Sequence, residues 1–440
     1  MAVFFSLITA TTLFAVLLCN LAECAAECKG SERRSILAFK AGVGDSKGRL
    51  QSWLEGTDCC RWPGITCNKT IGVVTSVDLS GHRWRLSGTA NMAALLSLSN
   101  LEHLDLSWND FESAVIVPKI GRPTNLAYLD LSNAGFSGKI PAELGNLTRL
   151  TTLHLSNIYR LSVTDFEVRG SLQTDNVNWL RSLVALEPLS LDGVDLSRIG
   201  KNWDSAVSNL RQLAHLSMAE CGLFPLFPAE SDSLRNLSAF LRDLDLSGNG
   251  NRDFPEQIPA WLQNFTALQM LDLSGCGLSG NVFPFRNLSL RKLNLFSNNL
   301  SGDVSFVFCN QPLLSFLSLM ENNFGDTIPT NISLPSLTYL DLSGNNFRGS
   351  VLESIARLVK LQHLGLGYNN FSGQIPVSLS KLSSLSFLDL GAVKLELLEN
   401  LTGVQFLVLS NNKLTLNFSP AWNPSFQLQH LGLSGCNIGG

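Results

Sequence analysis

The chain has 440 residues, with 32 lysines and arginines against 36 aspartates and glutamates, which gives a formal net charge of −4. Charged residues make up only 15% of the chain, and the cations form no basic stripe along it. Because binding to nucleic acid or to an anionic membrane surface depends on clustered positive charge, neither is expected as a partner.

Residues 1–26 are expected to be a signal peptide. Residues 2–18 are apolar or small and carry no charge, and Ala22, Ala25 and Ala26 supply small side chains near a cleavage point. The mature chain would begin at Glu27, and no later stretch reaches the roughly 18 uninterrupted apolar residues that a membrane span needs. The sequence therefore predicts a protein of the secretory pathway with no membrane span in its mature part.

Ten Asn-x-Ser/Thr acceptors agree with passage through the secretory pathway, where such asparagines are glycosylated. They are Asn68, Asn146, Asn236, Asn264, Asn287, Asn299, Asn331, Asn370, Asn400 and Asn417. They are spread over the mature chain, so we expect a glycosylated surface.

Residues 27–70 are expected to form an N-terminal cap. Ser31–Ala41 reads as a short amphipathic helix with Ser31 as its N-cap and with Ile36, Leu37 and Phe39 available for packing. Four cysteines belong to the same segment, and small caps in oxidising compartments are commonly held by disulfides. They are Cys28, Cys59, Cys60 and Cys67, and they allow three pairings, of which a bond between the two adjacent residues would be strained.

Residues 71–440 consist of about fifteen copies of the phrase L-x-x-L-x-L-x-x-N, from Val74 to Leu428, at intervals of about 24 residues. This period is typical of a leucine-rich repeat. In the copy at Leu337, period-2 alternation sends Leu340 and Leu342 inward, whereas Tyr339 and Asp341 face outward. The sequence therefore predicts an α/β solenoid: a curved array whose parallel strands line the concave face, with a disulfide-bonded N-terminal cap and no C-terminal cap.

The ninth position of the phrase is asparagine in seven copies, and its amide can pair backbone groups that the inward turn leaves without strand partners. These residues are Asn109, Asn249, Asn298, Asn322, Asn345, Asn369 and Asn412. Cys221, Cys276 and Cys436 occupy the same position in three further copies, so we interpret them as small buried thiols rather than as metal ligands or redox groups.

Two columns of side chains face outward from the strands. One contains Asp78, Asp105, Asp130, Asp245, Asp272, Asp341 and Asp389, which we interpret as a solvated strand face rather than as paired acid–base carboxylates. The other reads Phe316, Tyr339, His363, Phe387, Phe406 and His430 in six consecutive copies. With strands about 4.8 Å apart, these rings would form a ribbon roughly 25 Å long on the concave face. Either the rings stabilise the sheet by stacking, or they contact a protein or peptide ligand, the hypothesis we carry forward.

Little in the sequence indicates catalysis, a metal site or a cofactor. The six histidines lie in separate repeats, and no zinc-binding spacing is present. Gly275–Gly280 matches G-x-G-x-x-G, but this segment is a repeat turn with no long helix after it, so we do not expect a dinucleotide site. An enzyme is the weakest of the functions considered.

The segment from Glu32 to Cys67 resembles the N-terminal cap of plant extracellular leucine-rich-repeat proteins, and that resemblance implies the disulfides Cys28–Cys59 and Cys60–Cys67. Phe136–Pro141 and Phe371–Pro376 are similar to the plant-type F/L-S-G-x-I-P extension, which implies a second short sheet along the side of the solenoid. The long fourth repeat, with Asp175–Leu180, resembles plant receptor-like proteins.

That resemblance implies the ectodomain of a cell-surface receptor that recognises a peptide or microbial protein in defence or development and signals through co-receptor kinases. Such a receptor would continue beyond Gly440 through more repeats, a cysteine cap, a membrane helix and a short tail, so the sequence is expected to be a C-terminally truncated form. It would lie on the extracellular face of the plasma membrane if anchored, and would otherwise be secreted. The alternative is a secreted inhibitor similar to polygalacturonase-inhibiting proteins, which act on microbial cell-wall hydrolases.

Overall fold

The computed structural model describes residues 26–157, 171–200, 203–227, 234, 236–250, 256–282, 288–349, 354–371, 377–390, 403–408, 415–417, 427–432 and 437–439. The expected signal peptide, apart from Ala26, lies outside them. The chain divides into two compact units: unit 1 comprises residues 1–153 and 159–171, and unit 2 comprises residues 154–158 and 172–440. The division falls within strand β8 (Thr152–His154).

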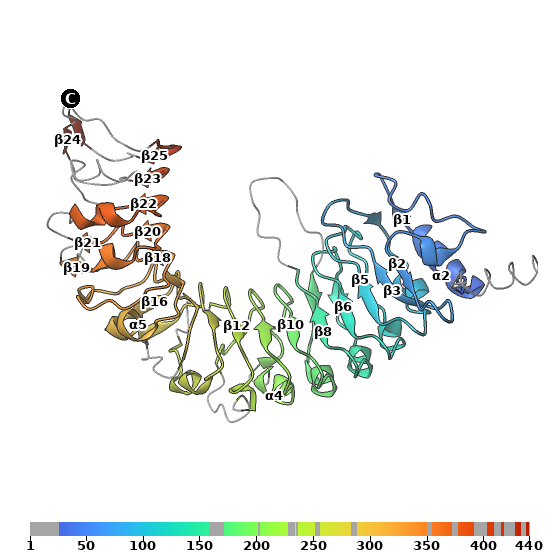
Figure 1. Ribbon diagram of the computed structural model, residues 1–440. Coiled ribbons are helices and arrows are strands. Elements are labelled where there is room, and N and C mark those ends of the chain that lie inside the picture. Colours follow the sequence, from blue (N-terminus) through green and yellow to red (C-terminus); the bar gives the residue numbers. More distant parts are fainter. Residues whose placement is uncertain are drawn as a thin grey trace, which may run out of the picture. The chain divides into compact units, whose positions relative to one another are not determined.

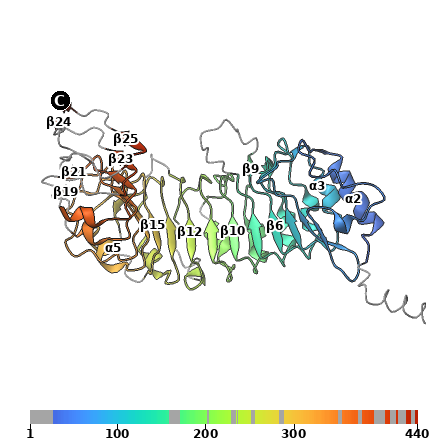
Figure 2. The same ribbon diagram turned by 45° about the horizontal axis from the view of Figure 1, so that its top comes forward.

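Unit 1 contains the cap and the first repeats. Its main strands are β2 (Ile65–Cys67), β3 (Val74–Asp78), β5 (His103–Asp105) and β6 (Tyr128–Asp130), and its shorter strands are β1 (Val43–Gly44), β4 (Ser87–Gly88) and β7 (Gly138–Lys139). Strand β2 is antiparallel to β3, whereas β3, β5 and β6 are parallel. The helices are α2 (Gly30–Lys40), α3 (Met92–Leu95) and the 3-10 helices η1 (Cys59–Arg61), η2 (Pro118–Gly121) and η3 (Ala142–Asn146). Figure 2 shows α2 and α3 next to each other at the N-terminal end of this unit.

The cap helix α2 covers Gly30–Lys40 rather than the expected Ser31–Ala41, and its N-cap lies two residues earlier than the sequence predicts. Its N-cap is Lys29, whose side chain makes no capping hydrogen bond, so the assignment of Ser31 as N-cap is wrong. The reason is the disulfide of Cys28, which fixes the chain immediately before the helix, so that the Lys29 carbonyl accepts the Arg33 N–H at 3.0 Å. Ile36 and Phe39 are fully buried, as the amphipathic pattern predicts.

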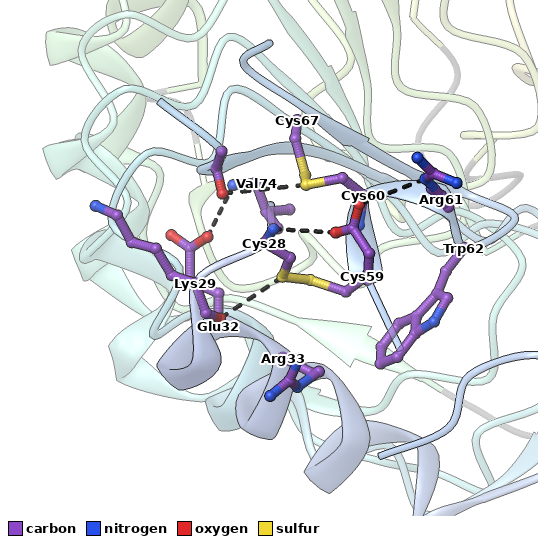
Figure 3. Close-up of a disulfide and its surroundings, with 12 residues drawn as sticks. Cys28, Lys29, Glu32, Arg33, Cys59, Cys60, Arg61, Trp62, Cys67 and Val74 are labelled. Atoms are coloured by element: carbon purple, nitrogen blue, oxygen red, sulfur yellow. Dashed lines mark hydrogen bonds and ion pairs between the residues drawn. A yellow bond between two sulfur atoms is a disulfide. The ribbon is translucent and has the colours of Figure 1, made fainter. Parts of the chain in front are cut away.

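Disulfides join Cys28 to Cys59 and Cys60 to Cys67, the pairing that the resemblance implies, with Cα–Cα distances of 5.4 Å in both (Figure 3). The buried Glu32 carboxylate also accepts the Val74 N–H at 2.9 Å. Since Val74 opens the first repeat strand, this hydrogen bond ties the cap to the sheet. The cap therefore supplies both an apolar cover and a polar partner for the first strand.

The described residues of unit 2 contribute eleven parallel strands to the main sheet, one from each successive repeat, and β10, β12 and β15 follow in this order along it in Figure 2. The strands are β10 (Pro188–Ser190), β11 (His215–Ser217), β12 (Asp243–Asp245), β13 (Met270–Asp272), β15 (Lys292–Asn294), β17 (Phe316–Ser318), β18 (Tyr339–Asp341), β20 (His363–Gly365), β22 (Phe387–Asp389), β23 (Phe406–Val408) and β25 (His430–Gly432). Adjacent strands pair in one register, so that Leu317, Leu340 and Leu364 lie opposite one another.

The strands of unit 2 line the inner side of its curve, and α4 and α5 lie on the outer side (Figure 1). The helices are α4 (Trp203–Val207), α5 (Ser305–Asn310), η4 (Asn178–Ser182), η7 (Ala260–Asn264), η8 (Ile355–Arg357) and η9 (Val377–Lys381). None of the helices within the described residues has the length and apolar character needed to cross a bilayer.

Short strands beside the main sheet form the second sheet in pieces. They are β9 (Leu172–Gln173), β14 (Ser279–Asn281), β16 (Asn299–Ser301), β19 (Arg348–Gly349), β21 (Asn370–Phe371), β24 (Thr415–Asn417) and β26 (Asn437–Gly439). Parallel pairs join β14 to β16, β19 to β21 and β24 to β26. Phe371 belongs to β21, and residues 372–376 of the same phrase lie outside the described residues.

The core of each unit is a stack of leucines with a column of phenylalanines beside it. Leu340 and Leu342 are fully buried, as the alternation predicts. In unit 2 the rings of Phe324, Phe347 and Phe371 follow one another at centroid distances of 6.1 and 6.2 Å. Because one repeat covers only one face of its neighbour, each buried leucine contributes its roughly 1.5–3 kcal/mol only within the stack.

Buried asparagines give successive turns the same geometry. The Asn345 amide donates to the carbonyls of Leu319 and Leu342 at 2.8 and 3.1 Å, and its oxygen accepts the Phe324 N–H at 3.1 Å. This arrangement satisfies backbone groups of two successive repeats, as the sequence predicts. Cys221 and Cys276 are buried in the same position, and each thiol lies 3.1 Å from a carbonyl of the preceding repeat. Cys436 and Asn412 lie outside the described residues.

Candidate ligand-binding surface

The predicted ring column lies in register on six neighbouring strands of unit 2. Each ring residue is the first residue of its strand, and pairing joins Phe316 to Tyr339, Tyr339 to His363, His363 to Phe387, Phe387 to Phe406 and Phe406 to His430. A leucine follows each ring residue in its strand, and in the first five strands this leucine is buried, so that the ring residue before it points to the opposite face of the sheet. The first four ring residues are half-buried, whereas Phe406 is 38% exposed.

The first four rings form a continuous stack. The centroids of Phe316 and Tyr339 are 4.2 Å apart, those of Tyr339 and His363 are 4.0 Å apart, and those of His363 and Phe387 are 4.1 Å apart, with interplanar angles between 6° and 11°. Phe406 and His430 are further apart, at 6.4 Å and 30°. The faces of the inner rings are therefore covered by each other. Cross-strand stacking, which the sequence left as one of two alternatives, is present, and it leaves mainly ring edges for any other contact.

Charged and polar groups contact rings of this stack. The Lys292 ammonium lies 5.5 Å from the Phe316 centroid and 3.0 Å from an oxygen of Asp272. On the neighbouring strands the Asp341 carboxylate lies 3.4 Å from His363 Nε2 and 3.5 Å from the Tyr339 hydroxyl. Burial, together with the Asp341 charge, raises the pKa of Tyr339 to about 12, so the phenol stays protonated.

The aspartate column differs from the solvated face that the sequence predicts. Asp272 and Asp341 are buried, and the carboxylates accept hydrogen bonds from the backbone two residues further on, for example from Ser343 N–H to Asp341 at 2.9 Å. Each therefore closes the turn that follows its strand. Burial favours a higher pKa for Asp341, but hydrogen bonds from His363 and Ser343 outweigh it and hold the pKa below its ordinary value. The interpretation as a solvent-facing column is wrong at these positions.

The sequence did not reveal two hollows in unit 2. One, of about 250 Å³, lies on the strand face and is lined by His215, Asp243, Met270 and Lys292, among others. The second, of about 630 Å³, lies where the strands begin, and its lining includes Phe240 and Leu313. The signal for the second was present in the sequence, since small residues stand before the leucines of the intervening repeats.

Seven of the glycosylation acceptors are exposed: Asn68, Asn146, Asn236, Asn264, Asn299, Asn331 and Asn370. Asn287 and Asn400 lie outside the described residues, and Asn417 lies in β24, where only the backbone is described. Exposure makes the seven accessible, and their modification stays a prediction.

Family descriptions match the cap and several repeats. "Leucine rich repeat N-terminal domain" matches residues 29–68, and "Leucine Rich Repeat" matches residues 125–147, 336–358 and 360–382. A further leucine-rich-repeat description matches residues 97–114. These ranges coincide with the disulfide-bonded cap and with strand-bearing repeats of both units.

Among solved structures, the complex named PEPR1–AtPEP1 matches with a TM-score of 0.64 and 27% identity, covering 93% of this chain and 59% of that one. The Arabidopsis receptor kinase HAESA, solved with the peptide hormone IDA and the co-receptor SERK1, matches with a TM-score of 0.63 and 25% identity, covering 88% of this chain and 70% of that one. The second of these neighbours is thus a receptor kinase that was solved with a peptide hormone.

In sequence, the chain is 31% identical over 308 residues to receptor-like protein EIX1 of Solanum lycopersicum, which covers 67% of this chain and 26% of that protein. It is 32% identical over 260 residues to receptor-like protein 9DC1 of Solanum pimpinellifolium, covering 58% of this chain and 25% of that protein. The chain thus spans about a quarter of the length of these relatives. By its disulfide-bonded cap and its repeats the chain is a leucine-rich-repeat protein, and the sequence relatives to which it is similar are plant receptor-like proteins.

Proposed function

We propose that this chain is a ligand-recognition ectodomain and that the ring column of unit 2 contacts a protein or peptide ligand. The observation that carries the proposal is the four-ring stack from Phe316 to Phe387, with centroid spacings of 4.0–4.2 Å. A side chain held between two others has little rotamer freedom left to lose on binding, which favours such residues as anchors. Phe406 and His430 continue the same column with more exposed rings.

The wider biological role follows from the relatives and is part of the proposal. Signalling would require co-receptor kinases, as the SERK1 complex of HAESA suggests. The chain would act outside the cell, where its cap disulfides and glycosylation acceptors are stable and accessible. It would have no catalysis of its own. A secreted inhibitor of a microbial hydrolase is less well supported, because the sequence relatives are receptor-like proteins.

The proposal can be tested with peptides selected from a random displayed library against the whole secreted chain. Single changes Tyr339→Ala and Phe387→Ala should weaken the selected peptides by about thirtyfold, since truncating an anchor typically costs about 2 kcal/mol. Tyr339→Phe should retain most of the affinity because it keeps the ring in the stack. Affinities are compared by calorimetry at equal folded concentration.

Two controls separate binding from folding. Lys360→Ala changes an exposed residue away from the column, and Tyr128→Ala removes a stacked ring of unit 1. Both should leave peptide affinity within about twofold of the wild type. If the ring variants lower secretion while the surviving protein binds with unchanged affinity, the stack is structural and the proposal fails.

A further inference from the structure

A group of cations lies close to an exposed tryptophan in unit 1, and none of its residues belongs to the ring column of unit 2. The group, here called the cationic platform, consists of Lys47, Arg49, Arg83, Trp84 and Arg85. It joins a loop of the cap to the loop that follows the first repeat strand. Trp84 is 43% exposed, whereas the cap tryptophans Trp53 and Trp62 are buried against each other.

The two loops of the platform are held firmly at their bases. Strands β1 and β4 pair through Val43 with Gly88, which brings the cap loop against the first repeat. The repeat loop is fixed at Gly81, where a Cβ would overlap the Trp108 carbonyl, and at Leu86, whose N–H donates to Asn109 Oδ1 at 2.8 Å. The four residues between these fixed points, 82–85, are all exposed. The outward side chains therefore stand on a fixed backbone.

Arg49 links the two loops directly. Its Nη1 donates to the carbonyl oxygens of Trp84 and Leu79 at 2.6 and 3.4 Å. The nearby Asp45 carboxylate is already engaged, because it accepts the backbone N–H groups of Arg49 and Leu50 at 2.9 and 2.7 Å. Because the hydrogen bonds of the Arg49 guanidinium go to neutral carbonyl oxygens, its positive charge adds to that of the platform.

Two further cations, Lys47 and Arg83, lie over the indole ring of Trp84. The Lys47 ammonium lies 5.5 Å from the Trp84 ring centroid, and the centre of the Arg83 guanidinium lies 5.7 Å from it. Both side chains are exposed, and neither forms an ion pair with a carboxylate of the described residues. The platform therefore presents clustered positive charge next to exposed aromatic surface, although the whole chain carries a net charge of −4.

We propose that this platform binds an acidic oligosaccharide, a chain of pyranose rings that carry carboxylates. The C–H groups on one face of a pyranose are weakly positive and pack on the negative face of an indole. A carboxylate attached directly to the ring then lies beside that indole, where Lys47 and Arg83 are placed to neutralise it. Sugar ring and carboxylate would therefore be recognised together.

Other polyanions fit less well. An acidic peptide carries its carboxylates on flexible acyclic side chains, which leave the indole without a flat partner. Nucleic acid binding uses a longer run of phosphate contacts and several stacking rings, and the platform has one exposed indole with a few cations. The two hollows described above, which would suit peptide side chains, are lined by residues of unit 2.

The test measures binding of a defined galacturonic acid oligomer to the whole secreted chain by calorimetry. The wild type should bind this oligomer at low salt and more weakly at physiological salt. It should bind the fully methyl-esterified oligomer at least about tenfold more weakly than the free acid. The double change Lys47→Gln with Arg83→Gln should weaken binding by about tenfold or more, and so should Trp84→Ala. The matched control is Lys119→Gln with Arg122→Gln, two exposed cations at η2, which should change affinity by less than about twofold.

Four outcomes would overturn the proposal. They are no binding by the wild type, equal binding of the methyl-esterified oligomer, equal losses in the platform and control doubles, and tighter binding of a polyglutamate peptide of the same charge. The last would assign the platform to acidic proteins instead. Tyr339→Ala and Phe387→Ala should leave oligosaccharide binding unchanged, so failure of the proposed peptide site would be seen separately.

Discussion

The outward ring column is built differently in the two units. In unit 1 the column reads Ser76, His103 and Tyr128, and its two rings stack at 4.2 Å and 13°. In unit 2 four rings stack without interruption between Phe316 and Phe387. The same strand register therefore produces a pair of stacked rings in unit 1 and a stack of four rings in unit 2, according to which residues occupy one position of the repeat.

The neighbouring carboxylates differ in the same way. Burial raises the pKa of Asp105, and repulsion from Asp130 and Asp78 adds to it. Asp341 is also buried, but His363 on the next strand donates to it and its pKa lies below the ordinary value. The repeat framework is thus common to both units, whereas the charge balance of the strand face is local. Substitutions at equivalent positions of the two units can therefore distinguish the stability that the repeat framework contributes from the stability that the side chains on the strand face contribute.

The largest effect should come from the framework and should be equal in the two units. Asn109 and Asn345 make the same contacts, each donating to carbonyls of two successive repeats and accepting one backbone N–H. Changing either to Ala leaves several buried backbone groups unpaired and should cost about 3 kcal/mol in its own unit. Hydrogen exchange measured by mass spectrometry reports each unit separately.

Asn346→Ala is the matched control, because this residue is the exposed neighbour of Asn345. It should change protection by no more than about 0.5 kcal/mol. A large difference between the losses caused by Asn109→Ala and Asn345→Ala would mean that the framework is not equivalent in the two units.

A smaller effect should distinguish the stacks. Tyr339→Ala removes two ring contacts, one with Phe316 and one with His363, whereas Tyr128→Ala removes one ring contact, with His103. With about 0.5–1.5 kcal/mol for each aromatic pair beyond burial, Tyr339→Ala should destabilise unit 2 by about 1–3 kcal/mol, roughly twice the loss in unit 1. Chemical denaturation followed by exchange protection measures both, and equal losses would show that stack length has no energetic consequence.

The smallest effect should be the pH dependence of stability, and it should run in opposite directions for Asp341 in unit 2 and Asp105 in unit 1. The folded pKa of Asp341 lies below its unfolded value, so its stabilising contribution is present above about pH 4 and is lost as pH falls through the folded pKa. Asp341→Asn should therefore cost about 1 kcal/mol at pH 7 and progressively less in acid. For Asp105 the folded pKa is raised, so stability is lost as pH rises through it, and Asp105→Asn should become relatively more stabilising toward neutral pH.

Unfolding of both variants and the wild type between pH 3 and pH 7 decides this point. Parallel pH profiles for the two variants would contradict the assignment of His363 as the group that compensates Asp341.

Much of this architecture could be predicted from the sequence, because one repeated phrase specifies strand, turn and buried asparagine together. The register that aligns Phe316 with Tyr339 and His363 follows directly from the period. Whether those rings would stack or stand apart could not be predicted, because it depends on side-chain rotamers across strands rather than on spacing. Similarly, the phrase Leu-Asp-Leu-Ser places Asp341 outward, but only the folded turn shows that Ser343 and His363 surround its carboxylate.

The cap shows the same limit. Its helix was recognisable from Ile36 and Phe39, yet its first residue was set by the covalent bond of Cys28, which local helix signals do not include. The cationic platform was hidden for another reason. Lys47 and Arg83 are far apart in a chain of low net charge, and they come together through the pairing of β1 with β4 and the hydrogen bonds of Arg49.

The four-ring stack also determines which chemical groups a partner can use there. Rings that cover one another's faces present their rims, where the C–H and N–H hydrogens carry a slight positive charge. Such a rim attracts oxygen atoms more than it attracts further aromatic rings. A peptide lying across Tyr339 and His363 would therefore be held largely through its carbonyl groups, which every residue possesses, and discrimination between peptide sequences would fall to the side chains that flank the stack.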